Sequence, residues 1–268
     1  MLPQQRTGNW IKESNEKWNN LDSDGIMQTG WVKIGTDWYF FHSTGERYVG
    51  WLPENGKTYH FNSNGIMDIG WKKINGYWYH FNSSGVMNTT TLTEGTRKYY
   101  FDNSAGVLYC TELIVNEEKQ RKTNWCWAAS AVMVGTYNTN STRTQEDIVK
   151  EIMGSSDKNN TATDPQARDA LNFASQNTKS GQIKNSFSYT DAVTQIDNNH
   201  PFMMHINWLE GGGHMVVCAG YKKENNIEYA QIVDPAANIK SKYFKCDDLN
   251  FIANFGYNIG TCVSIITY

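Results

Sequence analysis

The chain has 268 residues, a formal net charge of −3 and an aromatic content of 13%. This slightly acidic balance excludes a strongly basic surface for nucleic acid or for anionic membranes. The sequence contains no run of apolar residues long enough to cross a bilayer, so no membrane span is expected. The length accommodates one large domain or two modest ones.

The first ten residues, MLPQQRTGNW, lack the charged and then apolar pattern of a secretory signal peptide. Two explanations stay open: export by another route, or a signal that this sequence does not include. The cysteines are odd in number and irregular in spacing, which fits neither a disulfide framework nor a zinc pattern. No pairing can be deduced from them. They are Cys110, Cys126, Cys218, Cys246 and Cys262.

The first hundred residues repeat themselves with a period of 20. Full copies begin at Trp31, Trp51 and Trp71, and a degraded copy lies on either side of them. In each copy an aromatic run such as WYFF or WYHF favours a strand, and a polar turn ending in Gly follows it. A single hairpin of this size is unstable alone. The repeat therefore predicts an all-β solenoid of stacked hairpins over residues 1–109.

From about residue 110 the period stops. Helices are expected at 125–137, 144–154, 164–175 and 190–199; Thr144 is the expected N-cap of the second, and Gly154 lies past its end. The remaining segments, including FMMHINW, HMVVCAGYK and TCVSIITY, favour strands. Helices first and strands later indicate an α+β domain over residues 110–268.

The repeats resemble the choline-binding, or cell-wall-binding, repeats of Gram-positive surface proteins. The resemblance covers residues 8–109 and rests on Gly30-Trp31, Trp38-Tyr39-Phe40, Ser63-Asn64-Gly65, Met67, Gly70-Trp71 and Trp78-Tyr79. A quaternary ammonium ion makes no strong hydrogen bond, but aromatic faces attract it through cation–π contacts of about 0.5–2 kcal/mol each.

The resemblance implies cages that take two rings from one unit and one from the next. Trp31, Trp38 and Trp51 make the complete set, whereas Trp71 and Trp78 lack a third ring. The expected partner is a cell-wall polymer, and a choline-bearing teichoic acid is one candidate. The alternatives are another wall polymer, a host glycan, or rings that only hold the solenoid together.

The segment Asp22-Ser23-Asp24-Gly25 looks like the start of a calcium loop. The glutamate that such a loop requires later is absent, because Lys33 stands in its place. Sister units carry NSNG and NSSG at the same point, so a hairpin turn is the better interpretation. No metal and no cofactor are expected in this chain.

Four residues of the second half have the character of a catalytic set. Cys126 opens an apolar helix, where the positive end of the helix dipole favours a thiolate. His214 follows three glycines and begins an apolar strand. Asp234 ends a strand, where a carboxylate can orient an imidazole by accepting a hydrogen bond from its Nδ1. Gln120 lies six residues before the cysteine.

Each of these residues has an ordinary structural interpretation by itself, but the set together resembles the papain-like cysteine proteases. The string NWCWAAS resembles a branch that includes the AvrRpt2 effector proteases and the staphopain-like enzymes, over about residues 115–268. The resemblance implies a papain-like fold and an acyl transfer without metal. Cys126 is the nucleophile, His214 the acid and base, Asp234 the orienting group, and Gln120 helps to bind the oxyanion.

The chain departs from plant papain in having Asp in place of Asn and in its short length, which puts the substrate specificity in doubt. Among the other histidines, those at 42, 60 and 80 lie in the repeats, His200 precedes a proline and His205 lies in the middle of a strand. None of them is expected to act in catalysis.

The sequence therefore predicts a secreted or surface-attached cysteine endopeptidase that cleaves proteins or peptides and is anchored to a cell envelope. Three alternatives stay open. The first is a peptidoglycan amidase or endopeptidase of the NlpC or CHAP kind, whose cysteine usually lies in a different string. The second is an inactive surface adhesin, and the third is a transglutaminase-type transfer.

Overall fold

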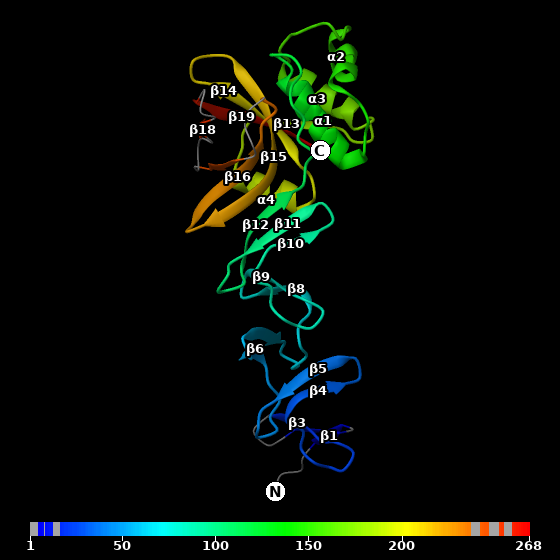
Figure 1. The fold of residues 1–268 in the computed structure, drawn as a ribbon, viewed down its shortest axis with the longest axis vertical. Helices are drawn as coiled ribbons and strands as arrows, with labels where there is room; N and C mark the ends of the chain where they lie inside the picture. The colour runs from blue at the N-terminus through cyan, green and yellow to red at the C-terminus, as the bar shows by residue number, and fades with distance from the viewer. Residues whose placement is uncertain (1–4, 8, 13–16, 237–241, 247–251, 255–258) are drawn as a thin grey trace. The chain divides into compact units, whose positions relative to one another are not determined.

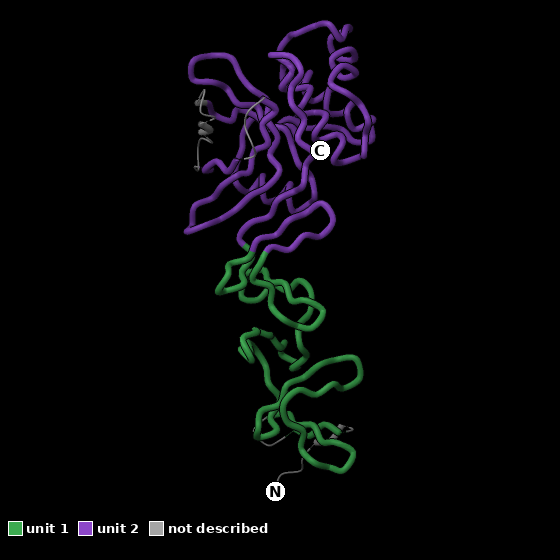
Figure 2. The backbone as a smooth tube through the Cα atoms, viewed as in Figure 1, with its two compact units in different colours: residues 1–90, 101–108 green, residues 91–100, 109–268 purple. Residues whose placement is uncertain are grey.

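The computed structural model describes residues 5–7, 9–12, 17–236, 242–246, 252–254 and 259–268. The chain forms two compact units, shown in Figure 2. The first consists of residues 1–90 and 101–108, and the second of residues 91–100 and 109–268. The expected boundary near residue 109 stays a prediction, since the compact unit that holds the later part of the chain also takes in residues 91–100.

The first unit is a series of antiparallel hairpins, as the repeat predicts. A three-stranded sheet contains β1 (Gln5–Thr7), β2 (Trp10–Lys12) and β3 (Trp18–Asn20), and the hairpins that follow are β4 (Gly30–Ile34) with β5 (Asp37–Phe41), β6 (Gly50–Glu54) with β7 (Lys57–Phe61), and β8 (Gly70–Ile74) with β9 (Tyr77–Phe81). In the last two hairpins an Asn-Gly pair forms the turn, and both residues have positive φ. This geometry matches the twist of the strands it joins.

Each hairpin is completed by the unit that follows it. After the polar turn the chain donates a backbone hydrogen bond to the preceding unit, from Met67 to the carbonyl of Trp38 and from Met87 to that of Thr58, both at 2.8 Å. A buried phenylalanine recurs in the four repeats after the first, as Phe41, Phe61, Phe81 and Phe101. The apolar core of the unit is therefore built across repeats, which is why one hairpin alone is insufficient.

Among its described residues the second unit has four helices and a ten-stranded sheet (Figure 1). The helices are α1 (Cys126–Thr139), α2 (Gln145–Met153), α3 (Asp164–Ala174) and α4 (Tyr189–Asp197). The strands are β10 (Leu92–Glu94), β11 (Arg97–Phe101), β12 (Leu108–Leu113), β13 (Gln182–Lys184), β14 (Phe202–Trp208), β15 (Gly213–Glu224), β16 (Ile227–Val233), β17 (Lys242–Lys245), β18 (Ile252–Asn254) and β19 (Ile259–Thr267). This content is compatible with the predicted α+β class.

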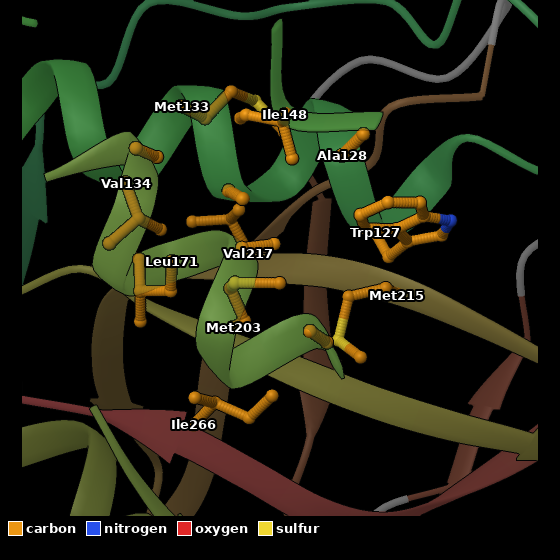
Figure 3. Close-up of a cluster of buried hydrophobic side chains, with 14 of the residues drawn as sticks. Trp127, Ala128, Met133, Val134, Ile148, Leu171, Met203, Met215, Val217 and Ile266 are labelled. Carbon is orange, nitrogen blue, oxygen red and sulfur yellow. The ribbon is translucent and has the colours of Figure 1, made fainter. Parts of the chain in front are cut away.

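The two faces of the sheet bury different helices because side chains alternate along each strand. Met203, Met215 and Val217 face the cluster formed by α1, α2 and α3, as Figure 3 shows. Met204 and Val216 pack in a second cluster with α4. The central strands β14 and β15 are thus covered on both sides, and the site described below lies at one end of them.

The helix boundaries follow the sequence signals closely. Thr144, Thr163 and Ser188 each cap a helix with a reciprocal bond from the third helical residue, and Gly154 ends α2 in the left-handed conformation. These are the local devices that define helix ends irrespective of packing. Within the described residues, none of the helices combines the length and the apolar character that a membrane crossing needs.

The hairpin β10–β11 joins the sheet of the second unit through β12. Its Arg97 donates to the side chain of Asn199 and to the backbone carbonyl of Asp197, both at 3.0 Å. Tyr137 of α1 donates to the same Asn199 oxygen at 2.7 Å. The last of the sequence repeats is therefore bonded to the helix that begins with Cys126.

Close packing of α1 against α3 gives a first prediction. A Cβ atom at Gly135 would lie 2.6 Å from the Cβ of Ala174 and 2.7 Å from its carbonyl carbon. Overpacking of this kind costs about 1–3 kcal/mol, more than the ~1 kcal/mol that alanine gains in helix propensity. We expect Gly135→Ala to lower the free energy of unfolding, measured by urea denaturation. An increase in stability would contradict the close contact.

Candidate functional site

The segment around Cys126 is hydrogen-bonded to the loop that precedes α3. The rings of Trp125 and Trp127 are almost completely buried, and their indole N–H groups donate to the carbonyls of Lys158 and Asn160 at 2.8 and 3.1 Å. Asn124 reaches the same loop through its own side chain. Because burial of a large ring is stabilising only when its polar group is bonded, the two tryptophans fix the position of the half-buried cysteine between them.

Cys126 is the first residue of α1. The residue before it, Trp125, makes no side-chain capping bond, and the first turn of the helix contains no acidic residue. The N–H groups at a helix start have no partner within the helix and carry partial positive charge. This end of α1 is therefore suited to binding a negatively charged atom.

A histidine and a carboxylate are bonded to one another beside this helix end. His214 is the second residue of β15 and Asp234 follows β16, which pairs with β15. The Nε2 atom of His214 lies 2.6 Å from Oδ1 of Asp234, whose side chain is only 1% exposed. The backbone N–H of Ala236 donates to the same oxygen at 2.8 Å. The sequence analysis expected the bond at Nδ1; the structure has it at Nε2, because the carboxylate approaches from the far end of the ring.

The surroundings of His214 act on its pKa in opposite directions. Burial lowers the pKa, but the hydrogen bond with Asp234 and the hydrogen bond with Cys126 raise it, and the net result is about 9. Since Nε2 is occupied by Asp234, the nitrogen that meets the thiol is Nδ1. The ring of Trp208 stacks on the imidazole with centroids 5.7 Å apart and screens it from water.

Cys126 and His214 line one cavity of about 380 Å³. The other walls come from β14, from the glycine-rich turn between β14 and β15, and from the segment before α3, and the lining includes Thr161, Ala162, His205, Asn207 and Trp208. The structure thus brings together three of the four residues that the sequence singled out, with a space beside the sulfur for a reacting group.

Gln120, the fourth residue, is tied to the same region by its backbone, which donates to the carbonyl of Pro235 at 2.9 Å. Its side-chain nitrogen donates to the carbonyls of Lys122 and Thr123, at 3.1 and 2.8 Å. It is not among the residues that line the cavity. Its role at an oxyanion therefore stays a prediction, and it requires one of these two bonds to be exchanged.

Two residues of the cavity were missed by the sequence analysis. Trp208 gave no motif of its own, and His205 was set aside as a histidine in the middle of a strand. His205 does lie within β14, but its ring lines the cavity together with Cys126 and His214. Only the register of β14 against β15, in which His205 pairs with Met215 of the same lining, brings it there.

A second cavity, of about 320 Å³, lies in the repeat unit. Trp31 and Trp38 meet edge to face with centroids 6.4 Å apart, and Tyr59 lies 4.7 Å from Trp31. Met67 and two serines complete the lining. The sequence analysis expected Trp51 as the third ring. Trp51 is not part of this lining; its ring lies 4.9 Å from Tyr79, one unit further on.

The charge beside this aromatic cavity favours a cation. The indole N–H of Trp31 donates to a carboxylate oxygen of Glu54 at 2.6 Å. That bond fixes the ring and brings negative charge to its edge, which strengthens the attraction of a cation for the aromatic faces. The remaining predicted rings, Trp71 and Trp78, meet with nearly the same geometry as the first pair, at 6.5 Å and 82°.

The first repeat, which the sequence analysis called degraded, has a similar pair. Trp10 and Trp18 meet at 6.4 Å and 82°, and Tyr39 lies 5.1 Å from Trp10. The position of Met67 is taken here by Arg47, whose guanidinium donates to the carbonyls of Asn64 and Ser63. The positively charged side chain of Arg47 therefore lies at the position that a methionine has in the other aromatic site.

Comparison with known families now identifies the second unit. The model of the papain-like cysteine protease AvrRpt2 matches residues 109–248, which is more than half of the chain. The chain belongs to this family. All four residues of the predicted catalytic set fall inside the region that matches the AvrRpt2-type protease.

The repeats match family models as well. A choline-binding repeat matches residues 69–111, and a putative cell wall binding repeat matches residues 29–46 and 49–67. The AvrRpt2-type protease of this chain is therefore joined to choline-binding repeats, as the sequence predicts. A comparison with curated proteins gives no match.

Similar solved structures come from pneumococcus and its phage. Choline binding protein F from Streptococcus pneumoniae is 34% identical over 38% of this chain and 35% of its own, with a TM-score of 0.37. CbpJ from S. pneumoniae TIGR4 is 36% identical over 39% and 36%, also at 0.37. The cell wall endolysin of phage Cp-1, complexed with choline, is 29% identical over 46% and 36%, at 0.34. This chain spans little more than a third of each of these proteins.

The raised pKa of His214 means that the contribution of Asp234 to the stability of the fold depends on pH. A group whose pKa rises on folding stabilises the fold fully below its ordinary value of about 6.5, and this stabilisation is lost as the pH rises through about 9. We expect Asp234→Asn to be most destabilising near pH 6, and the difference from wild type to shrink toward pH 10. Urea denaturation at both pH values measures it. A difference that is independent of pH would contradict the coupling.

Proposed function

We propose that this chain is a cysteine endopeptidase that is held on a cell-wall polymer by its aromatic repeats. The single observation that carries the proposal is that Cys126 and His214 line one cavity, with Asp234 bonded to the histidine, in a chain of the AvrRpt2 family. The papain-like fold, the catalytic roles and the location at the cell surface are part of the proposal.

In the proposed reaction His214 accepts the thiol proton of Cys126 at Nδ1, and the sulfur attacks the carbonyl carbon of a peptide bond. An imidazole held in hydrogen-bond contact with a thiol activates it near neutral pH. Asp234 supports this step because a carboxylate at Nε2 stabilises the imidazolium that forms. The stacked ring of Trp208 supports it as well, by keeping water from that hydrogen bond.

The negative charge that develops on the carbonyl oxygen lies close to the start of α1. Free N–H groups at this helix end can donate to it, and a donor of this type is often worth about 3 kcal/mol in the transition state. Gln120 is the second donor that the sequence suggests. His214 then returns its proton to the leaving amine, water enters with the histidine as base, and the acyl group leaves the sulfur.

The repeats supply attachment in this proposal. The cavity of Trp31, Trp38 and Tyr59 offers faces of aromatic rings without a cationic side chain, and Glu54 adds negative charge at its edge. These features suit a quaternary ammonium group such as choline. The match of residues 29–46 and 49–67 to a putative cell wall binding repeat supports attachment to the wall, and the match of residues 69–111 to a choline-binding repeat supports the ligand class.

A cysteine variant tests the catalytic part. We expect Cys126→Ala to abolish cleavage of a denatured protein such as casein, since no other group at the cavity replaces the sulfur. Cys246→Ala, which changes a cysteine outside the cavity, should keep the activity. Cleavage is followed by the release of labelled peptides. Turnover by Cys126→Ala would exclude the mechanism, and release of fragments from peptidoglycan but not from casein would favour the amidase alternative.

A tryptophan variant tests the attachment. We expect the full chain to be retained on a quaternary-amine resin and to elute with free choline, and Trp38→Ala to weaken retention by about tenfold, the loss of one well-placed ring. Trp18→Ala is the matched control, since Arg47 already occupies that part of the first repeat. Equal loss in both variants would indicate that the rings only maintain the fold.

A further inference from the structure

The cavity beside Cys126 carries a second histidine that the proposed reaction leaves unused. His205 comes from the middle of β14, and its side chain is 25% exposed. Its Nδ1 atom lies 2.7 Å from Oδ1 of Asp164, the first residue of α3. The other oxygen of Asp164 accepts a hydrogen bond from Ser264 at 2.5 Å. Two neighbouring strands therefore each present to one cavity a histidine with a carboxylate behind it.

The contact with Asp164 determines which nitrogen of His205 can meet a ligand. A lone pair on Nδ1 would repel a carboxylate at 2.7 Å, so the proton of the neutral ring belongs on Nδ1 and the lone pair on Nε2. The Nδ1–H bond of His205 does not point at the oxygen of Asp164, so the two groups make an electrostatic contact and not a hydrogen bond. In the described part of the chain Nε2 makes no hydrogen bond. It is left as an acceptor.

Gly213 keeps this acceptor uncovered. A Cβ atom at residue 213 would lie 2.7 Å from Nε2 of His205, and residue 213 is itself part of the cavity lining. Its backbone does not need the left-handed conformation, unlike Gly211 and Gly212. A side chain at residue 213 would meet both the ring of His205 and the carbonyl oxygen of Ile206, at 3.1 Å, so the third glycine leaves the edge of the ring open.

The charge around the cavity is complementary to a cation. Among the described residues of its lining there is no Lys and no Arg; His214, whose pKa is about 9, is the cationic group there, and Asp234 offsets its charge. The rings of Trp127 and Trp208 contribute to the walls, and the carboxylate of Asp164 lies directly behind the acceptor. A negative charge on Asp164 is stabilised at this position, because the carboxylate belongs to the first turn of α3 and accepts a hydrogen bond from Ser264. A lone-pair acceptor backed by a carboxylate and flanked by aromatic rings suits an ammonium or guanidinium group.

We propose that this cavity selects a lysine or arginine side chain of the substrate, with His205 as the specificity-determining acceptor and Asp164 as the charge that supports it. The proposal rests on the peptidase function proposed above and adds the substrate class. A hydrogen bond to a charged group discriminates against a neutral isostere by about tenfold or more in kcat/KM.

The test begins by sequencing the products that the full-length protein releases from a mixed peptide library, which shows the substrate position at which Lys or Arg is enriched. Two peptides that differ only at that position, one with arginine and one with its neutral isostere citrulline, are then compared. We expect wild type to favour arginine by about tenfold. Asp164→Asn and His205→Phe should each bring the ratio of the two kcat/KM values close to 1.

Asp169→Asn is the matched control, because it removes a carboxylate from the same helix at an exposed position outside the cavity. It should keep the wild-type ratio. A ratio is insensitive to partial loss of folded protein, so a destabilised variant still gives an answer. Cleavage without enrichment of Lys or Arg, or a ratio that Asp164→Asn leaves unchanged, would overturn this inference alone. Absence of any cleavage that depends on Cys126 would overturn the peptidase proposal and this inference with it.

Discussion

The hydrogen bond between His214 and Asp234 is the constraint on which the geometry of the site depends. It joins the second residue of β15 to the residue after β16, and both side chains are buried, with the indole of Trp208 stacked on the imidazole. A bond of this kind fixes the plane of the imidazole. Because one nitrogen is committed to the carboxylate, the other has a single direction available, and α1 places its first residue there.

The second fixed element is the start of α1 itself. Large rings on either side of Cys126 are bonded to a loop, while the helix behind them packs on α3 so closely that residue 135 has no side chain. The polypeptide thus holds the half-buried thiol between groups that are fixed by packing and by hydrogen bonds. The histidine is positioned from the sheet and the sulfur from the helices, and the cavity is the space that remains between them.

Much of this arrangement could be predicted from the sequence, because the relevant signals are local. The period of 20 and its aromatic runs define the hairpins, and the residues at helix ends define α2, α3 and α4. The order of cysteine, histidine and aspartate suggested the site. What could not be predicted depends on contacts between distant residues. The use of Nε2 by Asp234 depends on how β16 ends. The choice of Tyr59 and not Trp51 beside Trp31 depends on how one hairpin lies on the next. The role of His205 needed the register of β14.

The hairpin β10–β11 matches a choline-binding repeat in sequence. Its strands nevertheless belong to the sheet of the second unit, because β11 pairs with β12. If the chain were cut after this hairpin, β12 would lose a neighbour and expose an open sheet edge, which in other proteins invites aggregation. A fragment that is meant to keep the sheet of the second unit intact therefore has to begin before Leu92. The last repeat is shared in this sense: its sequence matches the repeats before it, and its strands complete the sheet that carries His214.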